Sequence, residues 1–171
     1  DLVQNLKQRY KCVLLDEYQD TSVAQQQLLL LAFGDGHSVT AVGDPLQSIY
    51  AWRGASAETT RSFPFLFRTK TGEPAQVLSL SDNYRSAAGI LHTANELISP
   101  LRSANPGSIP LRQGNLEFGS GEVNVGCYEN TAAEVAAIVS QISELLNAGA
   151  KPDHIAVLGR TSSTLLKIHE A

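Results

Sequence analysis

Short apolar runs alternate with segments of helical periodicity in the first part of the chain. Residues 11–15 form an apolar run followed at once by two carboxylates, which is typical of a buried parallel strand whose carboxyl end meets solvent. Thr21 or Ser22 can cap a following helix, with Gln25 completing a capping box from Ser22, and Gly34 is placed to end this helix. A functional site is therefore expected at the carboxyl end of the first strand.

Two further strands are predicted before residue 82. Residues 39–43 form a short, mainly apolar run, and residues 75–80 have the same character. A shorter helix, from about Ala55 to Pro64, separates these two runs. The resulting β-α-β-α-β order indicates an α/β fold built on a parallel sheet.

The second part of the chain continues this alternation. The apolar residues within 86–98 fall on one face of a predicted helix, which Ser99 and Pro100 are expected to stop. Residues 99–121 are rich in Gly, Pro, Ser and Asn and predict a long surface connection. A strand predicted at 122–128 then opens a second α/β segment.

The most clearly marked helix of the chain follows that strand. Thr131 and Glu134 have the spacing of a capping box, a continuous apolar stripe follows them, and Gly149 is placed to end the helix. A strand at 155–158 and a helical tail from Ser163 complete the predicted elements.

Composition limits the kind of protein. The 171 residues are 43% hydrophobic, which is enough for a packed core, and each part of the chain, divided after residue 82, carries a net charge of −2. Contact with a nucleic acid would therefore depend on a local groove and stacking side chains. No apolar run approaches a membrane span and no signal peptide is recognisable, so a cytoplasmic location is expected. Cys12 and Cys127 are predicted to be buried, reduced thiols.

The first candidate site is the segment Asp16-Glu-Tyr-Gln-Asp-Thr21, directly after the first strand. Adjacent carboxylates have two separable uses in a nucleotide hydrolase. Asp16 can hold Mg²⁺ that bridges the phosphates, and Glu17 can accept a proton from the attacking water. The alternative interpretation is a solvated acidic strand end, because such pairs are common.

The second candidate is residues 42–55, with the sequence VGDPLQSIYAWRGA, which follow the next predicted strand and should emerge beside Asp16. The amide of Gln47 can contact a terminal phosphate or water, and the rings of Tyr50 and Trp52 can stack on unpaired bases. The alternatives are that both aromatic residues belong to the core and that Arg53 forms a salt bridge.

The third candidate is Asn83-Tyr-Arg-Ser86, between the last predicted strand of the first part and the helix that follows. Arg85 can neutralise charge that develops on a transferring phosphoryl group, and Tyr84 can stack on a nucleotide base. The alternative is a helix N-terminus with an exposed arginine.

Together these three segments resemble motifs II, III and IV of the UvrD/Rep/PcrA group of superfamily 1 ATP-dependent DNA helicases. The long middle motif is the most specific. The resemblance covers most of residues 9–98 and implies a RecA-like P-loop NTPase fold with a parallel sheet. On this basis residues 1–82 are expected to be the C-terminal part of one motor domain, and 83–171 the N-terminal part of a second.

The resemblance also implies roles for individual residues. Asp16 corresponds to the Mg²⁺-associated carboxylate, Glu17 to the general base and Gln47 to the glutamine that senses the γ-phosphate. Tyr84 matches the residue that packs on adenine, and Arg85 the arginine that faces the γ-phosphate. The segment implied to meet single-stranded DNA carries Tyr50, Trp52 and Arg53.

The expected partners follow from the same resemblance. They are ATP, with Mg²⁺ as its cofactor, single-stranded DNA and single-strand/double-strand junctions, with movement in the 3′ to 5′ direction during repair or recombination. No GxxxxGK[ST] segment occurs in the 171 residues, so the chain alone is expected to be inactive and to belong to a longer motor. Two alternatives remain open, namely the motor of a RecB- or AddA-type helicase-nuclease and a non-catalytic regulatory or interaction module.

Overall fold

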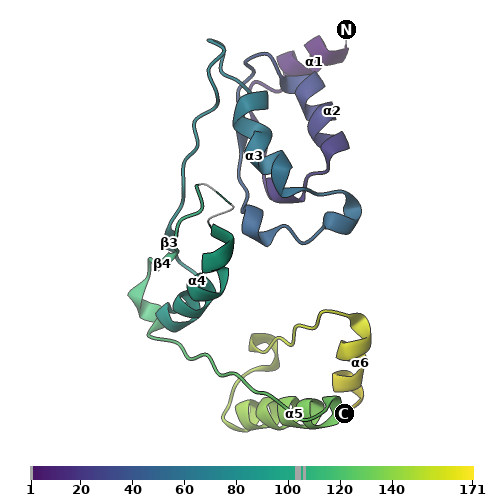
Figure 1. Cartoon of the computed structure of the whole chain (residues 1–171), viewed down its shortest axis with the longest axis vertical. Coiled ribbons are helices and arrows are strands. Elements are labelled where there is room, and N and C mark those ends of the chain that lie inside the picture. The colour runs from purple at the N-terminus through teal and green to yellow at the C-terminus, as the bar shows by residue number, and fades with distance from the viewer. Residues whose placement is uncertain (1, 103–104, 106) are drawn as a thin grey trace. The chain divides into compact units, whose positions relative to one another are not determined.

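The computed structural model describes residues 2–102, 105 and 107–171 (Figure 1). They divide into two compact units, Asp1–Val123 and Asn124–Ala171. Within the described residues, no helix is both long enough and apolar enough to cross a membrane.

The first part of the chain is built on two parallel strands. Strand β1 (Val13–Leu15) pairs with β2 (Val39–Ala41) in the register Val13 to Val39 and Leu15 to Ala41. The backbone N–H of Val42 donates to the carbonyl of Leu15 at 2.8 Å, which continues the pairing just beyond the strands. Both strands and their parallel direction confirm the prediction, and both carboxyl ends therefore lie at one edge.

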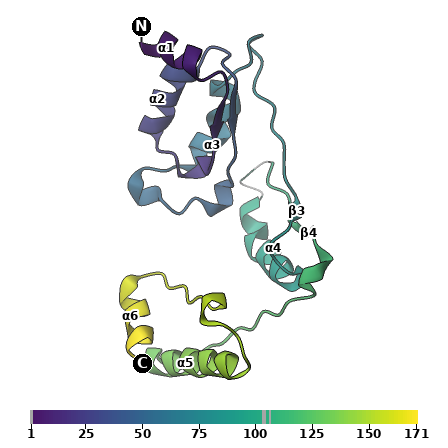
Figure 2. The same ribbon diagram turned by 180° about the vertical axis from the view of Figure 1, so that it is seen from behind.

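Three helices accompany these strands, and Figures 1 and 2 show them gathered together at the N-terminal end of the chain. Helix α1 (Leu2–Arg9), which the sequence analysis does not predict, contacts α2 (Val23–Phe33). The predicted capping box at the start of α2 is present, and Gly34 ends this helix with its N–H bonded to the carbonyl of Leu30 at 2.7 Å.

Helix α3 (Ala57–Leu66) extends two residues beyond the predicted end at Pro64. Pro64 lacks the N–H for one helical hydrogen bond, but the N–H of Phe67 still reaches the carbonyl of Phe63 at 2.9 Å. The same helix supplies the core of this part of the chain. Tyr18 packs edge-on against Phe63 with ring centres 5.1 Å apart, and Phe63 stacks on Phe67 at 4.7 Å.

The strand predicted at residues 75–80 does not form. The N–H of Ala75 donates to the carbonyl of Pro64 at 2.9 Å, but the segment pairs with no strand among the described residues. Val77, Leu78 and Leu80 are exposed in consequence. The prediction was wrong because apolar content favours a strand, whereas a strand also needs a neighbour for its backbone hydrogen bonds.

A second parallel pair consists of β3 (Asp82–Asn83) and β4 (Arg112–Gln113), with α4 (Ala88–Arg102) between them. Helix α4 continues through Ser99 and Pro100, contrary to the prediction, and β4 and a 3-10 turn at Leu116–Phe118 interrupt the predicted surface connection. Asn95 of α4 holds this connection in place. Its Nδ2 donates to the carbonyl of Leu111 at 2.7 Å, and its Oδ1 accepts from the N–H of Leu111 at 3.0 Å.

The second unit contains α5 (Thr131–Asn147), a 3-10 turn at Pro152–His154, and α6 (Ser162–Glu170), which contacts α5. The N-cap of α5 is Asn130 rather than Thr131, because the carboxamide of Asn130 already accepts the N–H of Ala133 at 3.0 Å.

The two strands predicted in this region do not form among the described residues. Within the part of the chain that the structure describes, residues 122–128 and 155–158 belong to no strand, and Val125 and Leu158 are more than nine-tenths exposed. Cys12 and Cys127 are free thiols, as predicted, but both are exposed rather than buried. The helical tail predicted from Ser163 is confirmed by α6.

Candidate functional site

The two adjacent carboxylates lie immediately beyond β1, as the sequence predicts. Asp16 and Glu17 are both exposed, and Oδ1 of Asp16 accepts the N–H of Glu17 at 2.9 Å. The backbone of Glu17 is left-handed, with φ 48° and ψ 41°, which is uncommon for a residue with a side chain. Strain of this kind gathers at functional sites, where the surrounding structure holds it in place.

A buried glutamine joins this strand end to the loop after β2. Gln19, in the 3-10 turn Tyr18–Asp20, is only 2% exposed. Its Nε2 donates to Oε2 of Glu17 at 2.7 Å, and its Oε1 accepts the N–H of Asp44 at 3.1 Å. The N–H of Tyr18 also donates to the carbonyl of Val42 at 2.9 Å. The two predicted loops therefore do emerge side by side.

Gln47 belongs to the 3-10 turn Pro45–Gln47, and its side chain is exposed. Its Nε2 donates to Oδ2 of Asp44 at 2.8 Å, while Oδ1 of Asp44 caps the turn by accepting the N–H of Leu46 at 2.9 Å. Glu17, Gln19, Asp44 and Gln47 thus form a continuous series of hydrogen-bonded residues. Gln19 and Asp44 were not predicted from the sequence. The motif does not show whether a polar side chain forms hydrogen bonds within the protein or only with water.

The aromatic residues of the same loop flank an arginine. Trp52, in the 3-10 turn Ala51–Arg53, is 75% exposed, so it is not the core residue of the alternative interpretation, whereas Tyr50 is half-buried. The guanidinium carbon of Arg53 lies 4.9 Å from the Tyr50 ring centre and 4.5 Å from that of Trp52. This compact cationic and aromatic cluster can contact a phosphate and a base together.

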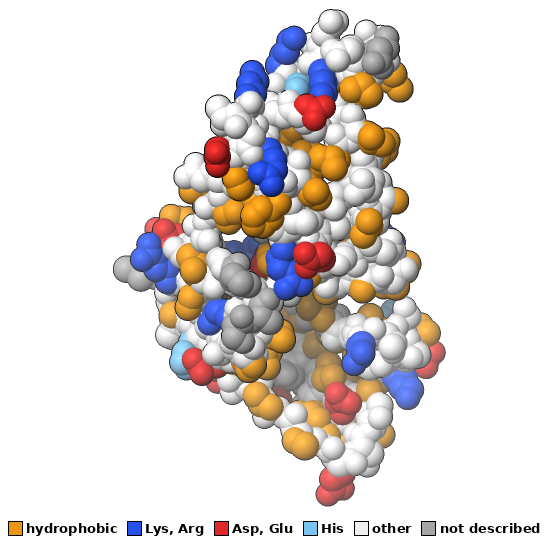
Figure 3. Space-filling model, turned by 45° about the horizontal axis from the view of Figure 1, so that its top comes forward, with side chains coloured by type: hydrophobic (Ala, Val, Ile, Leu, Met, Phe, Trp, Pro, Cys, Tyr) orange, Lys and Arg blue, Asp and Glu red, His pale blue; other side chains and the backbone are white. Residues whose placement is uncertain are grey.

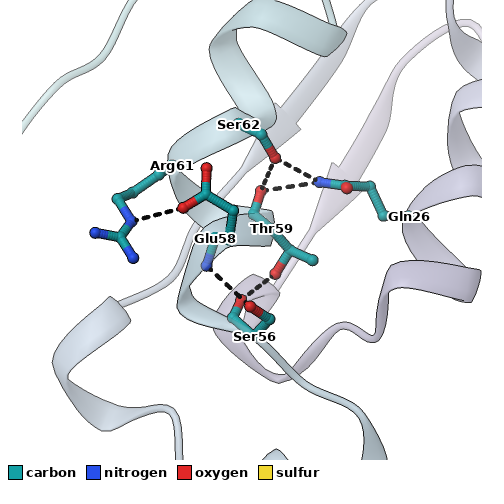
Figure 4. A network of polar contacts seen from close by, with 6 residues as sticks. All are labelled: Gln26, Ser56, Glu58, Thr59, Arg61 and Ser62. Carbon is teal, nitrogen blue, oxygen red and sulfur yellow. Dashed lines mark hydrogen bonds and ion pairs between the residues drawn. The ribbon is translucent and has the colours of Figure 1, made fainter.

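A core network joins α2, α3 and the side chain of Tyr18. Nε2 of Gln26, on α2, lies within hydrogen-bond distance of the Tyr18 hydroxyl (3.2 Å), the Thr59 carbonyl (2.9 Å) and the Ser62 hydroxyl (3.2 Å). Figure 4 shows the Gln26 amide pointing at Thr59 and Ser62 of α3, with Ser56 beside them. Burial raises the pKa of Tyr18, and the hydrogen bond with Gln26 lowers it by a smaller amount.

The third motif forms a separate cluster at the end of β3. Oδ1 of Asn83 accepts the N–H groups of Arg85 and Ser86 at 2.9 and 2.7 Å, which shapes the turn before α4. The side chains of Tyr84 and Arg85 are exposed. The Tyr84 ring lies against Gly114, where an added Cβ would meet a ring carbon at 2.8 Å.

The charges at this second cluster are paired. Asp82 and Arg112, opposite each other on β3 and β4, form an ion pair. The hydrogen bond from Arg112 holds the pKa of the Asp82 carboxyl below its usual value, and Asp82 raises the pKa of Arg112 in return.

Basic side chains do not gather into one broad patch on the face that Figure 3 shows. Lysine and arginine are interspersed there with acidic side chains, as the net charge of −4 leads one to expect. A cavity of about 960 Å³ in the first unit lies beside β2, and its lining includes Val39, Phe63 and Phe67 but not Asp16, Glu17 or Gln47. The side chains of these three motif residues therefore lie outside this cavity.

Comparison with known families agrees with the motifs. The model of the UvrD/REP helicase N-terminal domain matches residues 1–67, and that of the UvrD-like helicase C-terminal domain matches residues 78–171. These matches and the parallel strand pairs define an α/β fold of the RecA-like helicase kind. The chain belongs to the UvrD-like helicase family.

Individual relatives are similar over nearly the whole chain. DNA helicase II of Haemophilus influenzae is 37% identical over 99% of the chain, and the ATP-dependent DNA helicase UvrD2 of Mycobacterium tuberculosis (H37Rv) is 31% identical over 95%. One subunit of the ATP-dependent helicase/nuclease of Lactococcus lactis (IL1403) is 30% identical over 99%. The chain spans 22% of the length of the first two relatives and 16% of the third.

Proposed function

We propose that this chain forms part of an ATP-dependent DNA helicase or translocase, in which ATP hydrolysis drives movement on single-stranded DNA. The observation that carries the proposal is the joining of two loops. Gln19 hydrogen-bonds Glu17, which follows β1, and the backbone of Asp44, which lies in the loop that bears Gln47 and Trp52. The backbone that carries Gln47 continues directly to Trp52, so a shift of Gln47 can be passed along this loop to the aromatic cluster.

The hydrolytic roles are divided among exposed side chains around the strand ends. Glu17 accepts a proton from the attacking water, and the Gln47 amide contacts the terminal phosphate or that water. Arg85 neutralises negative charge on the transferring phosphoryl group, and Tyr84 packs on the adenine. The exposure of all four side chains leaves each of them accessible to a nucleotide.

Asp16 is the proposed Mg²⁺ ligand. The described residues contain no group of three or more His, Cys, Asp and Glu side chains able to hold a metal ion. A single carboxylate still fits Mg²⁺, which retains several waters and is usually bound through one or two carboxylates and the substrate phosphates. When bound, Mg²⁺ would neutralise phosphate charge at this strand end.

Tyr50, Trp52 and Arg53 form the proposed contact with single-stranded DNA. An exposed ring stacks on any base, which suits a motor that must move along every sequence. The guanidinium of Arg53 adds a positive charge that attracts the DNA backbone. We extend the proposal to single-strand/double-strand junctions, to 3′ to 5′ movement and to a role in repair or recombination.

The same proposal assigns residues 1–82 to one motor domain and 83–171 to another, with ATP bound where the two domains meet in the complete protein. This assignment is supported by the two family matches, which cover residues 1–67 and 78–171 and leave residues 68–77 between them. Because the 171 residues contain no GxxxxGK[ST] loop, hydrolysis requires residues outside this chain, and we expect the chain alone to be inactive.

The test is Glu17→Gln in the complete protein that contains this chain. Loss of the proposed general base should lower DNA-stimulated ATP hydrolysis by about 10²- to 10⁴-fold while nucleotide binding is retained. The matched control is Glu96→Gln, which alters an exposed carboxylate on α4 and should leave hydrolysis unchanged. Normal turnover by Glu17→Gln would reject the assignment of Glu17, and absence of ATP hydrolysis in the wild-type protein would reject the proposed function.

A second candidate is the motor portion of a helicase-nuclease, which the similarity to the helicase/nuclease of Lactococcus lactis supports. Degradation of linear DNA by the complete protein in the presence of ATP would identify this function. A purified protein that unwinds DNA and leaves its strands intact would exclude it.

A further inference from the structure

The side-chain amide of Gln19 is held at both ends inside the protein. Gln19 is 2% exposed, its Nε2 donates to Glu17 and its Oε1 accepts from the backbone of Asp44. Only one orientation of an amide satisfies a carboxylate on one side and an N–H group on the other. The backbone carbonyl of Gln19 is also engaged, since it accepts the Ser48 hydroxyl at 3.0 Å.

The acceptor of this amide is a side chain that would otherwise rotate freely. Glu17 is exposed, and a glutamate in water exchanges among several rotamers. A charge-assisted hydrogen bond of 2.7 Å from a buried donor selects one of them. The left-handed backbone of Glu17 sets the direction in which its side chain leaves the Cα atom. The carboxylate is therefore oriented before any ligand arrives.

Gly43 supplies an independent sign that this arrangement is built in. A Cβ on Gly43 would lie 2.7 Å from Oε1 and 3.0 Å from the backbone nitrogen of Gln19, closer than packed atoms are found. The backbone of the second loop thus approaches the Gln19 amide so closely that an added Cβ would force the amide to shift. The approach brings the N–H of Asp44 to the amide oxygen.

Asp44 carries the connection onward. Its backbone N–H binds Gln19, and its carboxylate accepts both the N–H of Leu46 and the side-chain amide of Gln47. The position of Gln47 is in this way tied to that of Glu17 through two intervening residues. Neither intervening side chain needs to contact the nucleotide to influence hydrolysis.

We infer that Gln19 is a positioning residue that orients the carboxylate of Glu17 for water activation and, through Asp44, sets the place of Gln47. This inference rests on the proposed function. It predicts that loss of the Gln19 amide lowers the turnover of ATP while leaving its binding intact, because a misplaced base slows chemistry rather than association.

The experiment compares two buried glutamines in the complete protein. Gln19→Met keeps the side-chain volume and removes both hydrogen bonds of the amide, and Gln26→Met makes the same change in the core network of α2 and α3, away from the carboxylates. We expect Gln19→Met to lower kcat for DNA-stimulated ATP hydrolysis on the order of 10- to 100-fold, with KM for ATP nearly unchanged. Gln26→Met should lower thermal stability and leave kcat close to that of the wild type.

Gln19→Glu supplies a readout that a purely structural role would not produce. The new carboxyl group lies where it can donate to Glu17 only when protonated, and when ionised it repels Glu17. We compare the kcat of each variant with that of the wild type at the same pH. The ratio of the Gln19→Glu kcat to the wild-type kcat should therefore rise as the pH is lowered. The ratio of the Gln26→Met kcat to the wild-type kcat should stay constant with pH.

Two results would overturn the inference. One is a kcat for Gln19→Met within about twofold of the wild type, because oriented catalysis predicts a larger loss. The other is a loss of kcat that parallels the loss of thermal stability in both methionine variants. Wild-type protein and Glu17→Gln are measured alongside, so that failure of the proposed function, seen as absence of wild-type hydrolysis or normal turnover by Glu17→Gln, is distinguished from failure of this inference.

Discussion

The guanidinium carbon of Arg53 lies 4.5 Å from the centre of the Trp52 ring, while Trp52 remains 75% exposed. The cation thus steadies the ring without covering most of it. Tyr50 also contacts the cation, with its ring centre 4.9 Å from the guanidinium carbon and 6.2 Å from the Trp52 ring centre. An exposed tryptophan held in this way is prepared to stack on a base.

Replacing Trp52 by alanine should therefore weaken the binding of single-stranded DNA. Stacking on an aromatic side chain contributes about 1–3 kcal/mol per base, so the Kd should rise by roughly 5- to 150-fold. Fluorescence anisotropy with a labelled oligonucleotide measures this change. Phe65→Ala is the matched control, since Phe65 is an exposed ring on α3 outside the loop, and its Kd should not change. Equal losses in both variants would contradict the stacking role of Trp52.

Alkaline pH should destabilise the protein through Tyr18. Burial raises the pKa of Tyr18 above its usual value of 10.0, so the folded state prefers the neutral phenol. The resulting stability is fully present below the unfolded pKa and is lost as the pH rises through the folded pKa. Thermal unfolding measured from about pH 8 to about pH 11 should show a falling midpoint that is shallower in Tyr18→Phe.

Tyr10→Phe provides the comparison for Tyr18→Phe, because it removes a hydroxyl from an exposed ring outside the core cluster that contains Tyr18. At neutral pH, Tyr18→Phe should lower the free energy of unfolding by about 1 kcal/mol, because it removes the hydroxyl that accepts a hydrogen bond from Gln26. A slope that is identical in wild type and Tyr18→Phe would show that another group controls alkaline unfolding.

Adding a methyl group to Gly43 should disturb the candidate site. The Cβ of Gly43→Ala would lie 2.7 Å from Oε1 of Gln19, so the amide must shift away from Asp44 or Glu17. We expect kcat for ATP hydrolysis to fall about tenfold or more, because small displacements of a catalytic group are costly. Steady-state ATPase assays of the complete protein check this outcome.

Gly72→Ala separates a steric effect from a general effect of replacing glycine. Gly72 has φ +85° and no atom within 4 Å of an added Cβ, so alanine there strains the backbone without contacting the site. It should lower stability by about 1 kcal/mol and leave kcat unchanged. If Gly43→Ala behaved as Gly72→Ala does, the close approach to Gln19 would have no catalytic importance.

The turn that presents Tyr84 and Arg85 should depend on Asn83. Its Oδ1 accepts two backbone N–H groups, those of Arg85 and Ser86, and Asn83→Ala removes both bonds. Loss of such a cap costs about 1 kcal/mol, so KM for ATP should rise about fivefold. Asn83→Asp keeps the acceptor and should remain close to the wild type.

Asn115→Ala is the control for this turn. Asn115 makes a similar bond, from the N–H of Glu117 to its Oδ1 at 3.0 Å, but it presents no residue of the three motifs. Its KM for ATP should be that of the wild-type protein. An unchanged KM in Asn83→Ala would mean that the turn keeps its shape without the asparagine.

Interactions between residues close in sequence could be predicted well. The capping box of Ser22 and Gln25, the end of α2 at Gly34, and the short parallel strands before the first two motifs all formed as the sequence indicates. Such features arise from hydrogen bonds and apolar periodicity within a few residues, and both can be recognised in the amino-acid sequence. The positions of the carboxylates and of Gln47 at adjoining strand ends followed from the same reasoning.

Features that depend on distant partners could not be predicted. The apolar runs at 75–80, 122–128 and 155–158 resemble strands, yet they pair with no strand among the described residues, and strand pairing is decided by neighbours rather than by composition. Likewise, the sequence does not indicate that Gln19 is buried and hydrogen-bonded to Glu17 and Asp44.

The sequence by itself determined the family and the order of the motifs, because these are properties of residue type and local spacing. Only the tertiary structure decided that the Gln19 amide lies between Glu17 and Asp44, with Gly43 allowing the approach. The reason is that a hydrogen bond between side chains of two loops depends on how closely their backbones approach, and that distance is set by the packing of β1 and β2 beneath them.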